Sequence, residues 1–365
     1  MPGSPQWPHH ESVVISSGAR TGLPVIIAVH SSVLGPAAGG CRIWRYPRWQ
    51  DGLEDALRLS AAMTAKFAAA GLACGGGKTV VALPEGYDLT PDRRHDLLSD
   101  IGDAVEALDG RYATAPDVGT SAEDMVVIGE RTSHVFCKPA EHGGSGGSSP
   151  ATADGTLAAL RAVGARLSGG TTNGTDSTGN TGDTGPLHGL RLAVVGLGNV
   201  GSRLADLLSK AGAELLLSDI DPSKREIADR LGAAWAEPHE ALTAEVDIVV
   251  PAALGGVLTE QIIPQLRCRA VVGPANNQLA LPQVADSLQA RGIVWVPDYI
   301  ASAGGVIHAV TLELDKRTED EARQRVRGIE HTVAGLLQDA DSRGVTVAAV
   351  TEELVRARLA TGDQG

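Results

Sequence analysis

The stretch RLAVVGLGNVGSRLADLLSKAGAELLLSD, residues 191–219, decides the fold. It opens with an apolar run that is typical of a buried strand, and a glycine-rich turn follows directly. Val200, Leu204 and Leu208 then recur at helical spacing, which predicts a helix over residues 199–211. A second apolar run completes the stretch. The order strand, helix, strand predicts two parallel strands joined by a crossover helix.

The turn has the spacing Gly196-Leu-Gly198-Asn-Val-Gly201. Glycines at this spacing allow a tight turn, the close approach of a pyrophosphate, and close contact between helix and strand. The N-terminus of the following helix offers N–H groups and positive potential to phosphates. Between a strand and a helix, the motif therefore predicts a dinucleotide-binding site, which includes Asn199 and Val200.

A carboxylate ends the second strand of the stretch. Asp219 stands 18 residues after Gly201, where an acidic side chain accepts hydrogen bonds from ribose hydroxyls and repels a 2′-phosphate. This position predicts NAD rather than NADP as the cofactor. Asp221 is the closest alternative, and an ordinary strand-end carboxylate is the reading without a function.

Strands and helices alternate from residue 190 to 300, which predicts a parallel sheet with crossover helices. A Gly/Ser-rich hinge, EHGGSGGSS, precedes this region. We therefore expect an α/β protein of two domains, with residues 1–145 as a substrate and catalytic domain and residues 146–319 as a Rossmann domain. Coming after the sheet is complete, the helices of about 320–365 are expected to pack back on the first domain.

Composition narrows the class of protein further. The 365 residues carry a net charge of −13, which disfavours nucleic acid and anionic membranes as partners. Four cysteines without a CxxC pair, together with the lack of a long apolar run, predict a cytoplasmic protein with reduced thiols and no metal site. Residues 168–186 contain no aliphatic or aromatic side chain, and we expect them to form a mobile surface loop.

Two lysines stand 12 residues apart in MTAKFAAAGLACGGGKTVV, residues 63–81. Lys66 falls in the last turn of a helix that we expect to begin with Asp51 as its N-cap. Lys78 follows Gly75-Gly76-Gly77, and three glycines allow a ligand to approach the backbone. Burial among apolar neighbours would lower the pKa of either lysine and make it useful as a base. Two surface lysines at a helix end and a strand start are an equally good reading.

Asp117 lies between a proline and a glycine in YATAPDVGT, on a predicted loop. A loop carboxylate can exchange protons with a nearby amine. The alternative is an Asx-type turn, in which the same side chain only closes the loop.

Eight segments now occur in an informative order along the chain. They are GPAAGGCRIW (35–44), MTAKFAAAGLACGGGKTVV, YATAPDVGT, SSPATA (148–153), GLGNVG, PAALGGVL (251–258), PANNQLA (274–280) and PDYIASAGGVI (297–307). Together they resemble the amino acid dehydrogenase superfamily, and specifically the leucine, valine and phenylalanine dehydrogenases. The resemblance covers about residues 12–315. It implies two domains with a cleft between them, NAD in the second domain, and oxidative deamination of an L-amino acid to its 2-oxo acid and ammonia by a homo-oligomer.

The resemblance also implies roles for single residues. Lys66 would hold the substrate carboxylate, Lys78 would activate water, and Asp117 would pass protons to and from the substrate nitrogen. The remaining contacts carried over are Gly39, Gly40 and Asn277 for the substrate carboxylate, Thr152 for the nicotinamide carboxamide, and Asn276 for cofactor binding. The family usually has Asn where Ser302 stands here, which implies one hydrogen bond fewer beside the cofactor or substrate.

In the family, four positions contact the substrate side chain, and here they are Ala38, Ala115, Val306 and Ala309. Leucine-specific relatives typically carry Leu at the first and Val at the last, so this chain implies a larger cavity and phenylalanine or tryptophan as substrate. Three alternatives stay open: Trp44 or Trp295 refills the space, the enzyme is a branched-chain dehydrogenase, or the protein is a weakly active NAD-binding sensor.

Overall fold

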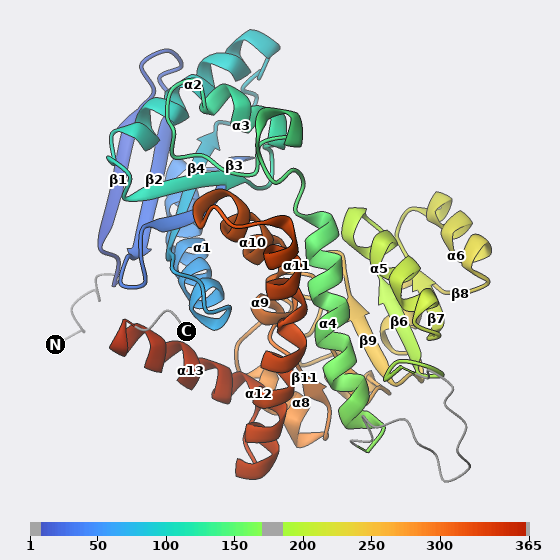
Figure 1. The fold of residues 1–365 in the computed structure, drawn as a ribbon. Helices are drawn as coiled ribbons and strands as arrows, with labels where there is room; N and C mark the ends of the chain where they lie inside the picture. Colours follow the sequence, from blue (N-terminus) through green and yellow to red (C-terminus); the bar gives the residue numbers. More distant parts are fainter. Residues whose placement is uncertain (1–8, 170–184, 363–365) are drawn as a thin grey trace, which may run out of the picture. The chain divides into compact units, whose positions relative to one another are not determined.

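The computed structural model describes residues 9–169 and 185–362 of the chain (Figure 1). These residues form two compact units. The first comprises Met1–Gly147, Ala309–Thr318 and Leu354–Gly365, and the second comprises Ser148–His308 and Glu319–Glu353. Most of the loop predicted at 168–186 lies outside the described residues.

The first unit is built on a five-stranded mixed sheet in the order β1-β2-β4-β3-β5. The strands are β1 (Ser12–Ser17), β2 (Pro24–Ser31), β3 (Ala37–Arg45), β4 (Gly75–Leu83) and β5 (Tyr112–Pro116). The pairs β1–β2 and β2–β4 are antiparallel, whereas β3 runs parallel to both of its neighbours. The segment HVFCK, residues 134–138, is apolar enough for a strand but makes only an isolated bridge, between Val135 and Thr114.

Helices cover both faces of this sheet. Helix α1 (Trp49–Ala69) packs on β4 and β2, while α2 (Pro91–Glu106) and α3 (Ala122–Ile128) contact β5. Helix α1 starts earlier than expected: Arg48 is its N-cap, and Asp51, predicted as the N-cap, is the acidic third residue of the capping box. The Arg48 side chain accepts no helix N–H; instead, Asp51 accepts the Arg48 backbone N–H at 3.0 Å and pairs with the Arg48 guanidinium at 2.6 Å. The residue preferences for N-caps do not anticipate this arrangement.

The three glycines before Lys78 are packed against the protein itself. A Cβ at Gly75 would meet the backbone of Ser31, and a Cβ at Gly76 would meet the backbone of Thr64 in α1. At Gly77 it would meet the ring of Tyr112. The expectation that these glycines make room for a ligand is therefore wrong, because the neighbouring helix, strand and ring already occupy that room.

The second unit contains a six-stranded parallel sheet in the order β11-β10-β9-β6-β7-β8. Its strands are β6 (Arg191–Val195), β7 (Glu214–Ser218), β8 (Ala234–Trp235), β9 (Ile248–Pro251), β10 (Ala270–Val271) and β11 (Val294–Trp295). Strand order reverses at β6, where the glycine-rich turn begins, as in a doubly wound nucleotide-binding sheet. The connection between β9 and β10 contains only a 3-10 turn, at Ile263–Gln265, where the alternation of strands and helices predicts a helix.

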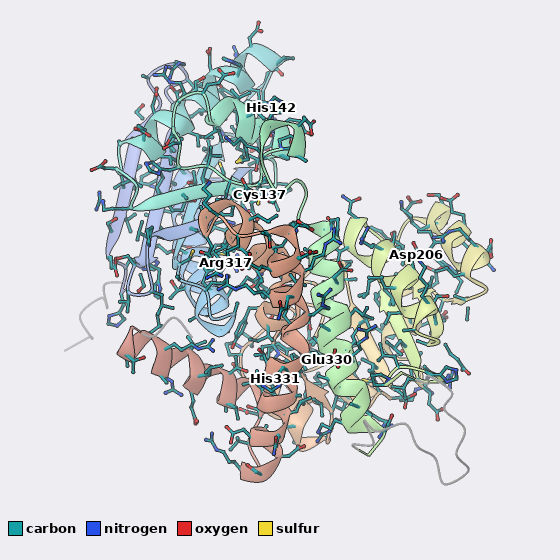
Figure 2. All side chains as sticks on the ribbon, viewed as in Figure 1. Cys137, His142, Asp206, Arg317, Glu330 and His331 are labelled. Atoms are coloured by element: carbon teal, nitrogen blue, oxygen red, sulfur yellow. The ribbon has the colours of Figure 1, made fainter. Side chains whose placement is uncertain are left out.

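The helices of the second unit pack on this sheet or on one another. They are α4 (Ser149–Leu167), α5 (Asn199–Lys210), α6 (Arg225–Leu231), α7 (Pro238–Leu242), α8 (Val284–Ala290), α9 (Asp298–Ala301), α11 (Glu319–Arg327) and α12 (Ile329–Arg343). Helices α10 (Gly304–Ala309) and α13 (Val347–Thr361) each run from this unit into the first. Asp206 of α5 pairs with Arg230 of α6 at 2.7 Å (Figure 2).

The C-terminal helices do not pack as expected. An apolar stripe at helical spacing, Val326, Ile329, Val333 and Leu336, is buried, but α11 and α12 lie against α4 of the second unit (Figure 1). Only the last segment joins the first unit, where Arg358 donates to the carbonyl oxygen of Ala68 at 2.5 Å. Small side chains on α4 allow α11 and α12 to approach it closely; Gly155, for example, lies against Ile329.

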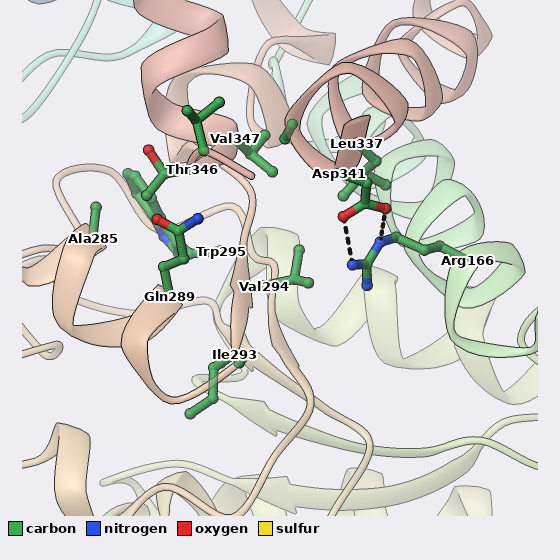
Figure 3. A pocket seen from close by; sticks show the side chains of 13 residues that line it. Arg166, Ala285, Gln289, Ile293, Val294, Trp295, Leu337, Asp341, Thr346 and Val347 are labelled. Atoms are coloured by element: carbon green, nitrogen blue, oxygen red, sulfur yellow. Dashed lines mark hydrogen bonds and ion pairs between the residues drawn. The ribbon is translucent and has the colours of Figure 1, made fainter. Parts of the chain in front are cut away.

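A pocket of about 120 Å³ lies in the second unit beside Trp295 and Thr346, with the Arg166–Asp341 ion pair at its wall (Figure 3). None of the site residues predicted from the sequence lines it, so this cavity is separate from the predicted site. All four cysteines are free and buried, including Cys137 (Figure 2). Among the described residues, no helix is both long and apolar enough to cross a membrane.

Candidate active site

Lys78 and Asp117 form an ion pair in the first unit. Strand β4 carries Lys78, whose side chain is 5% exposed, and Asp117 follows the last residue of β5. Lys78 Nζ lies 3.0 Å from Asp117 Oδ2. The reading of Lys78 as a surface lysine is therefore wrong, and the two groups stand close enough to share or exchange a proton.

Burial and charge act on this pair in opposite directions. Burial lowers the pKa of Lys78 below its ordinary value, although the negative charge of Asp117 opposes that change. Burial alone would raise the pKa of Asp117, but the positive charges of Lys78 and Arg42 outweigh it, and the pKa of Asp117 is lowered. The carboxylate is thus held ionised beside a lysine that gives up its proton more readily than an exposed one.

The turn after Asp117 is closed by another side chain. The Thr120 hydroxyl accepts a hydrogen bond from the Asp117 N–H at 2.9 Å and donates to the Cys41 carbonyl at 2.7 Å. Within the described part of the chain, the Asp117 carboxylate bonds only to Lys78 and Arg42. The Asx-turn interpretation is therefore wrong, because Thr120 takes that role and leaves the carboxylate facing two cations.

Gly40 borders this ion pair. A Cβ at Gly40 would lie 2.7 Å from the Asp117 Cβ and 3.0 Å from Lys78 Nζ. Gly40 pairs with Ala115 on β5, and Ala38 lies two residues earlier on the same face of β3. The structure therefore brings Gly40, Ala38 and Ala115 onto the strand surface that carries Lys78, while Gly39 faces the opposite side.

Lys66 lies in the last turn of α1, as predicted, and is half-buried. Helix α1 packs on the sheet face that carries Lys78, since Gly76, two residues before Lys78 on β4, approaches Thr64. Lys66 is thus on the element that covers the Lys78 face.

Three charged or polar residues beside the pair were not predicted. Arg42 Nε donates to Asp117 Oδ2 at 2.8 Å, and Arg42 Nη1 donates to Asp55 Oδ2 at 2.7 Å. The Tyr46 hydroxyl also donates to Asp55 Oδ2 at 2.7 Å. One signal was available in the sequence: Arg42 stands two residues after Gly40, so strand alternation places it on the same face.

In the second unit, the glycines of the turn have the geometry that a dinucleotide requires. Gly196 has a φ of +110°, and a Cβ there would lie 2.5 Å from Ala253. A Cβ at Gly201 would collide with the Gly196 carbonyl, whereas one at Gly198 would meet nothing within 4 Å. The open position is the N-cap of α5, next to Asn199 and Val200, so the turn has room for a pyrophosphate at the helix N-terminus.

The two candidate acids after β7 have different partners. Asp219 Oδ2 accepts the N–H of Leu197 in the glycine-rich turn at 2.6 Å, and its Oδ1 accepts the N–H of Asp221 at 2.9 Å. The Asp221 carboxylate instead accepts the N–H of Ser223 and caps the next 3-10 turn. Asp219 is therefore the acid that is attached to the dinucleotide turn.

The ANNQ segment is held by buried partners. Asn277 has a φ of +54°, and its N–H donates to Asp298 Oδ2 at 2.6 Å. The fully buried Gln278 amide donates to the Gly273 carbonyl and accepts from the Trp295 indole. These anchors leave Asn276 and Asn277 exposed.

The remaining predicted positions can be placed individually. Ser302 Oγ lies 3.5 Å from Asn276 Oδ1, so the serine still reaches the amide despite its shorter side chain. Thr152 lies in the first turn of α4 against Gly305. Val306 and Ala309 both lie on α10, where Val306 is half-buried and Ala309 is buried.

The two tryptophans that could refill a substrate cavity lie in different surroundings. Trp44 is 54% exposed at the end of β3. Trp295 packs in the core of the second unit and donates to Gln278.

Family models match both units. Residues 10–134 match the Glu/Leu/Phe/Val dehydrogenase dimerisation domain, and residues 216–365 match the Glutamate/Leucine/Phenylalanine/Valine dehydrogenase model. Residues 157–270 match the NAD-binding domain of D-isomer specific 2-hydroxyacid dehydrogenases. The chain belongs to the Glu/Leu/Phe/Val dehydrogenase family. It is an oxidoreductase that acts on amino acids, and its cofactor is NAD.

Individual relatives differ in the amino acid they are named for. Leucine dehydrogenase of Bacillus cereus is 37% identical over 96% of this chain and 91% of its own length. Phenylalanine dehydrogenase of Caldalkalibacillus thermarum is 36% identical over 97% and 92%. L-tryptophan dehydrogenase of Nostoc punctiforme is 36% identical over 96% and 93%, and its crystal structure aligns with a TM-score of 0.79, covering 98% of both chains.

Proposed function

We propose that the protein catalyses the reversible NAD-dependent oxidative deamination of an L-amino acid with a bulky apolar side chain. The observation that carries this proposal is the buried Lys78–Asp117 pair, joined at 3.0 Å beside Gly40. A sensor that only binds NAD would not need a buried lysine and carboxylate held in this way. The weakly active sensor is therefore the less favoured reading.

The proposed chemistry divides between cofactor and protein. When bound, NAD would supply the hydride acceptor for the substrate Cα, and water would replace the nitrogen at that carbon. The products are then the 2-oxo acid, ammonia, NADH and one proton. Lys78, with its lowered pKa, takes the proton of the attacking water. Asp117 exchanges a proton with the substrate nitrogen, which its lowered pKa allows because the carboxylate is ionised.

The other assignments are part of the same proposal. Lys66, Asn277 and the backbone of Gly39 and Gly40 bind the substrate carboxylate. The cofactor is bound by the glycine-rich turn, Asp219, Thr152 and Asn276. We also propose a homo-oligomer, for which the match to a dimerisation domain is the support; light scattering would test it.

The substrate that we propose is phenylalanine or tryptophan. Ala38 and Ala115 border the strand surface beside Gly40, and both are small and buried. Ala38 and Ala309 replace bulkier residues, so a valine side chain would leave space and lose apolar contact worth about 0.8 kcal/mol per methylene. Relatives at 36–37% identity are named for leucine, phenylalanine or tryptophan, so the proposed preference rests on the pocket positions.

The test is to measure kcat/KM for phenylalanine, tryptophan, leucine and valine under one condition, with NADH absorbance as the readout. We expect an aromatic substrate to win by about ten- to a hundred-fold, which is the discrimination that apolar pockets achieve. The double variant Ala38→Leu/Ala309→Val should shift preference towards leucine. A wild-type preference for leucine or valine would favour the branched-chain alternative, and an unchanged profile in the variant would show that these positions do not line the side-chain site.

A further inference from the structure

We propose that Arg42 is a positioning residue that fixes the orientation of the Asp117 carboxylate, so that Oδ2 faces the protein and Oδ1 faces the substrate nitrogen. This inference rests on the proposed function, because it assigns a role within that site. Arg42 acts through Asp117 and is not itself expected to touch the substrate.

The geometry of the two donors defines the orientation. Arg42 Nε at 2.8 Å and Lys78 Nζ at 3.0 Å both bond to Asp117 Oδ2. Among the residues that the structure describes, Oδ1 receives no hydrogen bond. Two donors on one oxygen prevent the carboxylate from rotating about its Cβ–Cγ bond, which leaves the other oxygen as the acceptor for an incoming N–H group.

Arg42 is itself held from the other side. Its Nη1 donates to Asp55 Oδ2 at 2.7 Å, and Asp55 also accepts hydrogen bonds from Tyr46 and from Arg58. The side chains of Arg42 and Asp55 are only 19% and 15% exposed. A guanidinium can donate from Nε to one carboxylate and from Nη1 to the other because its donor nitrogens are held apart in a fixed plane. A lysine would have to reach both carboxylates from a single nitrogen.

The positive charge of Arg42 also acts on both members of the catalytic pair. Lys78 and Arg42 are the charged partners of Asp117, and the nearby Cys41 thiol is also influenced by Asp124 and Arg94. The charge of Arg42 lowers the pKa of Asp117 as well as that of Lys78. Removing Arg42 therefore raises the pKa of Asp117 and the pKa of Lys78. The pH range in which Asp117 is ionised and Lys78 can lose a proton moves towards alkaline pH.

Arg42→Gln and Arg42→Lys separate charge from geometry. For Arg42→Gln we expect kcat to fall at least about tenfold, with little change in NAD affinity, and the acid limb of the pH–kcat/KM profile to move by about one pH unit to the alkaline side. Arg42→Lys should bring the acid limb back but leave kcat low. The matched control is Arg45→Gln, an exposed arginine on the same strand that bonds to the carbonyls of Pro84 and Tyr87.

The results have distinct meanings. An unmoved pH profile in Arg42→Gln, or full recovery of kcat in Arg42→Lys, would overturn the positioning role. Arg42→Gln leaves the Asp55 carboxylate without its partner Arg42. If that variant does not fold, the double variant Arg42→Gln/Asp55→Asn removes the negative charge of Asp55 as well. Wild-type protein without amino acid dehydrogenase activity would contradict the proposed function instead. Carboxyl-carbon NMR titration of Asp117 would then still test Arg42, because the pKa of Asp117 should rise in Arg42→Gln without any substrate present.

Discussion

Lys78 occupies a position where a lysine would ordinarily be costly. Its side chain is almost fully buried on β4, and the carboxylate of Asp117 compensates for the lost hydration. The same arrangement lowers the pKa of the lysine through burial, so the interaction that keeps the lysine in the fold also prepares it for proton transfer.

Lys78→Ala tests the catalytic role. We expect turnover to fall by about two to four orders of magnitude, because the base is lost, while NAD still binds at the glycine-rich turn of the second unit. Steady-state kinetics and NADH fluorescence titration measure the two effects separately. Lys210→Ala, which removes an exposed lysine of α5, is the control. Turnover of Lys78→Ala within about tenfold of wild type would contradict the assignment of Lys78 as the catalytic base.

Asp219 combines two functions that a single substitution can separate. Its carboxylate accepts the Leu197 N–H and, in our proposal, repels the 2′-phosphate of NADP. Asp219→Asn keeps an acceptor for Leu197 but removes the charge. We expect NADP efficiency to rise about tenfold relative to NAD, since close like charges cost on the order of 1–4 kcal/mol. Asp221→Asn should leave the ratio unchanged. Comparable use of both cofactors by the wild type would already contradict the prediction.

At the scale of elements, local patterns predicted what each segment forms but not what it packs against. The stripe on α11 and α12 correctly indicated a buried face, yet its partner is α4 rather than the first unit. The glycine turn was predictable because the dinucleotide dictates its spacing. The role of Gly75–Gly77 was not, because a glycine run indicates a close approach without naming the neighbour. Arg42 and Asp55 meet only through the packing of α1 on β3.

Two glycine-to-alanine changes should have opposite effects. In Gly76→Ala, the new Cβ meets the backbone of Thr64, so α1 must move away from β4. We expect a loss of about 1–3 kcal/mol in the free energy of unfolding. Gly335→Ala is the matched change in the exposed middle of α12, where a Cβ meets nothing within 4 Å.

Removing backbone freedom at Gly335 should add about 0.5–1 kcal/mol to the free energy of unfolding. Urea unfolding followed by circular dichroism measures both variants. A stable, fully active Gly76→Ala protein would show that the α1–β4 contact tolerates a methyl group and that the glycine has another purpose.

At the scale of the whole molecule, each unit is assembled from segments far apart in the sequence, and its stability depends on buried polar contacts between them. In the first unit, His10 lies edge-on to His30 with ring centroids 4.8 Å apart. His10 Nε2 lies 2.9 Å from Ser60 Oγ in α1, and His30 Nδ1 lies 2.9 Å from Thr64 Oγ1. The neutral imidazole of His10 thus connects the segment before β1 to α1, and that of His30 connects β2 to α1.

This contact predicts how stability changes with pH. Burial lowers the pKa of His10 and His30 below the ordinary value of 6.5. Below pH 6.5 the unfolded chain therefore binds protons that the folded chain does not, and the free energy of unfolding falls as pH decreases. A second loss should begin near pH 3.8, where Asp100 and Asp117, whose folded pKa is lowered, become protonated on unfolding. Urea midpoints measured from pH 8 to pH 3 should therefore fall in two steps. His10→Gln/His30→Gln should remove the upper step, and His95→Gln, an exposed histidine of α2, should retain it. A flat wild-type curve between pH 8 and pH 5 would contradict the burial of two neutral histidines.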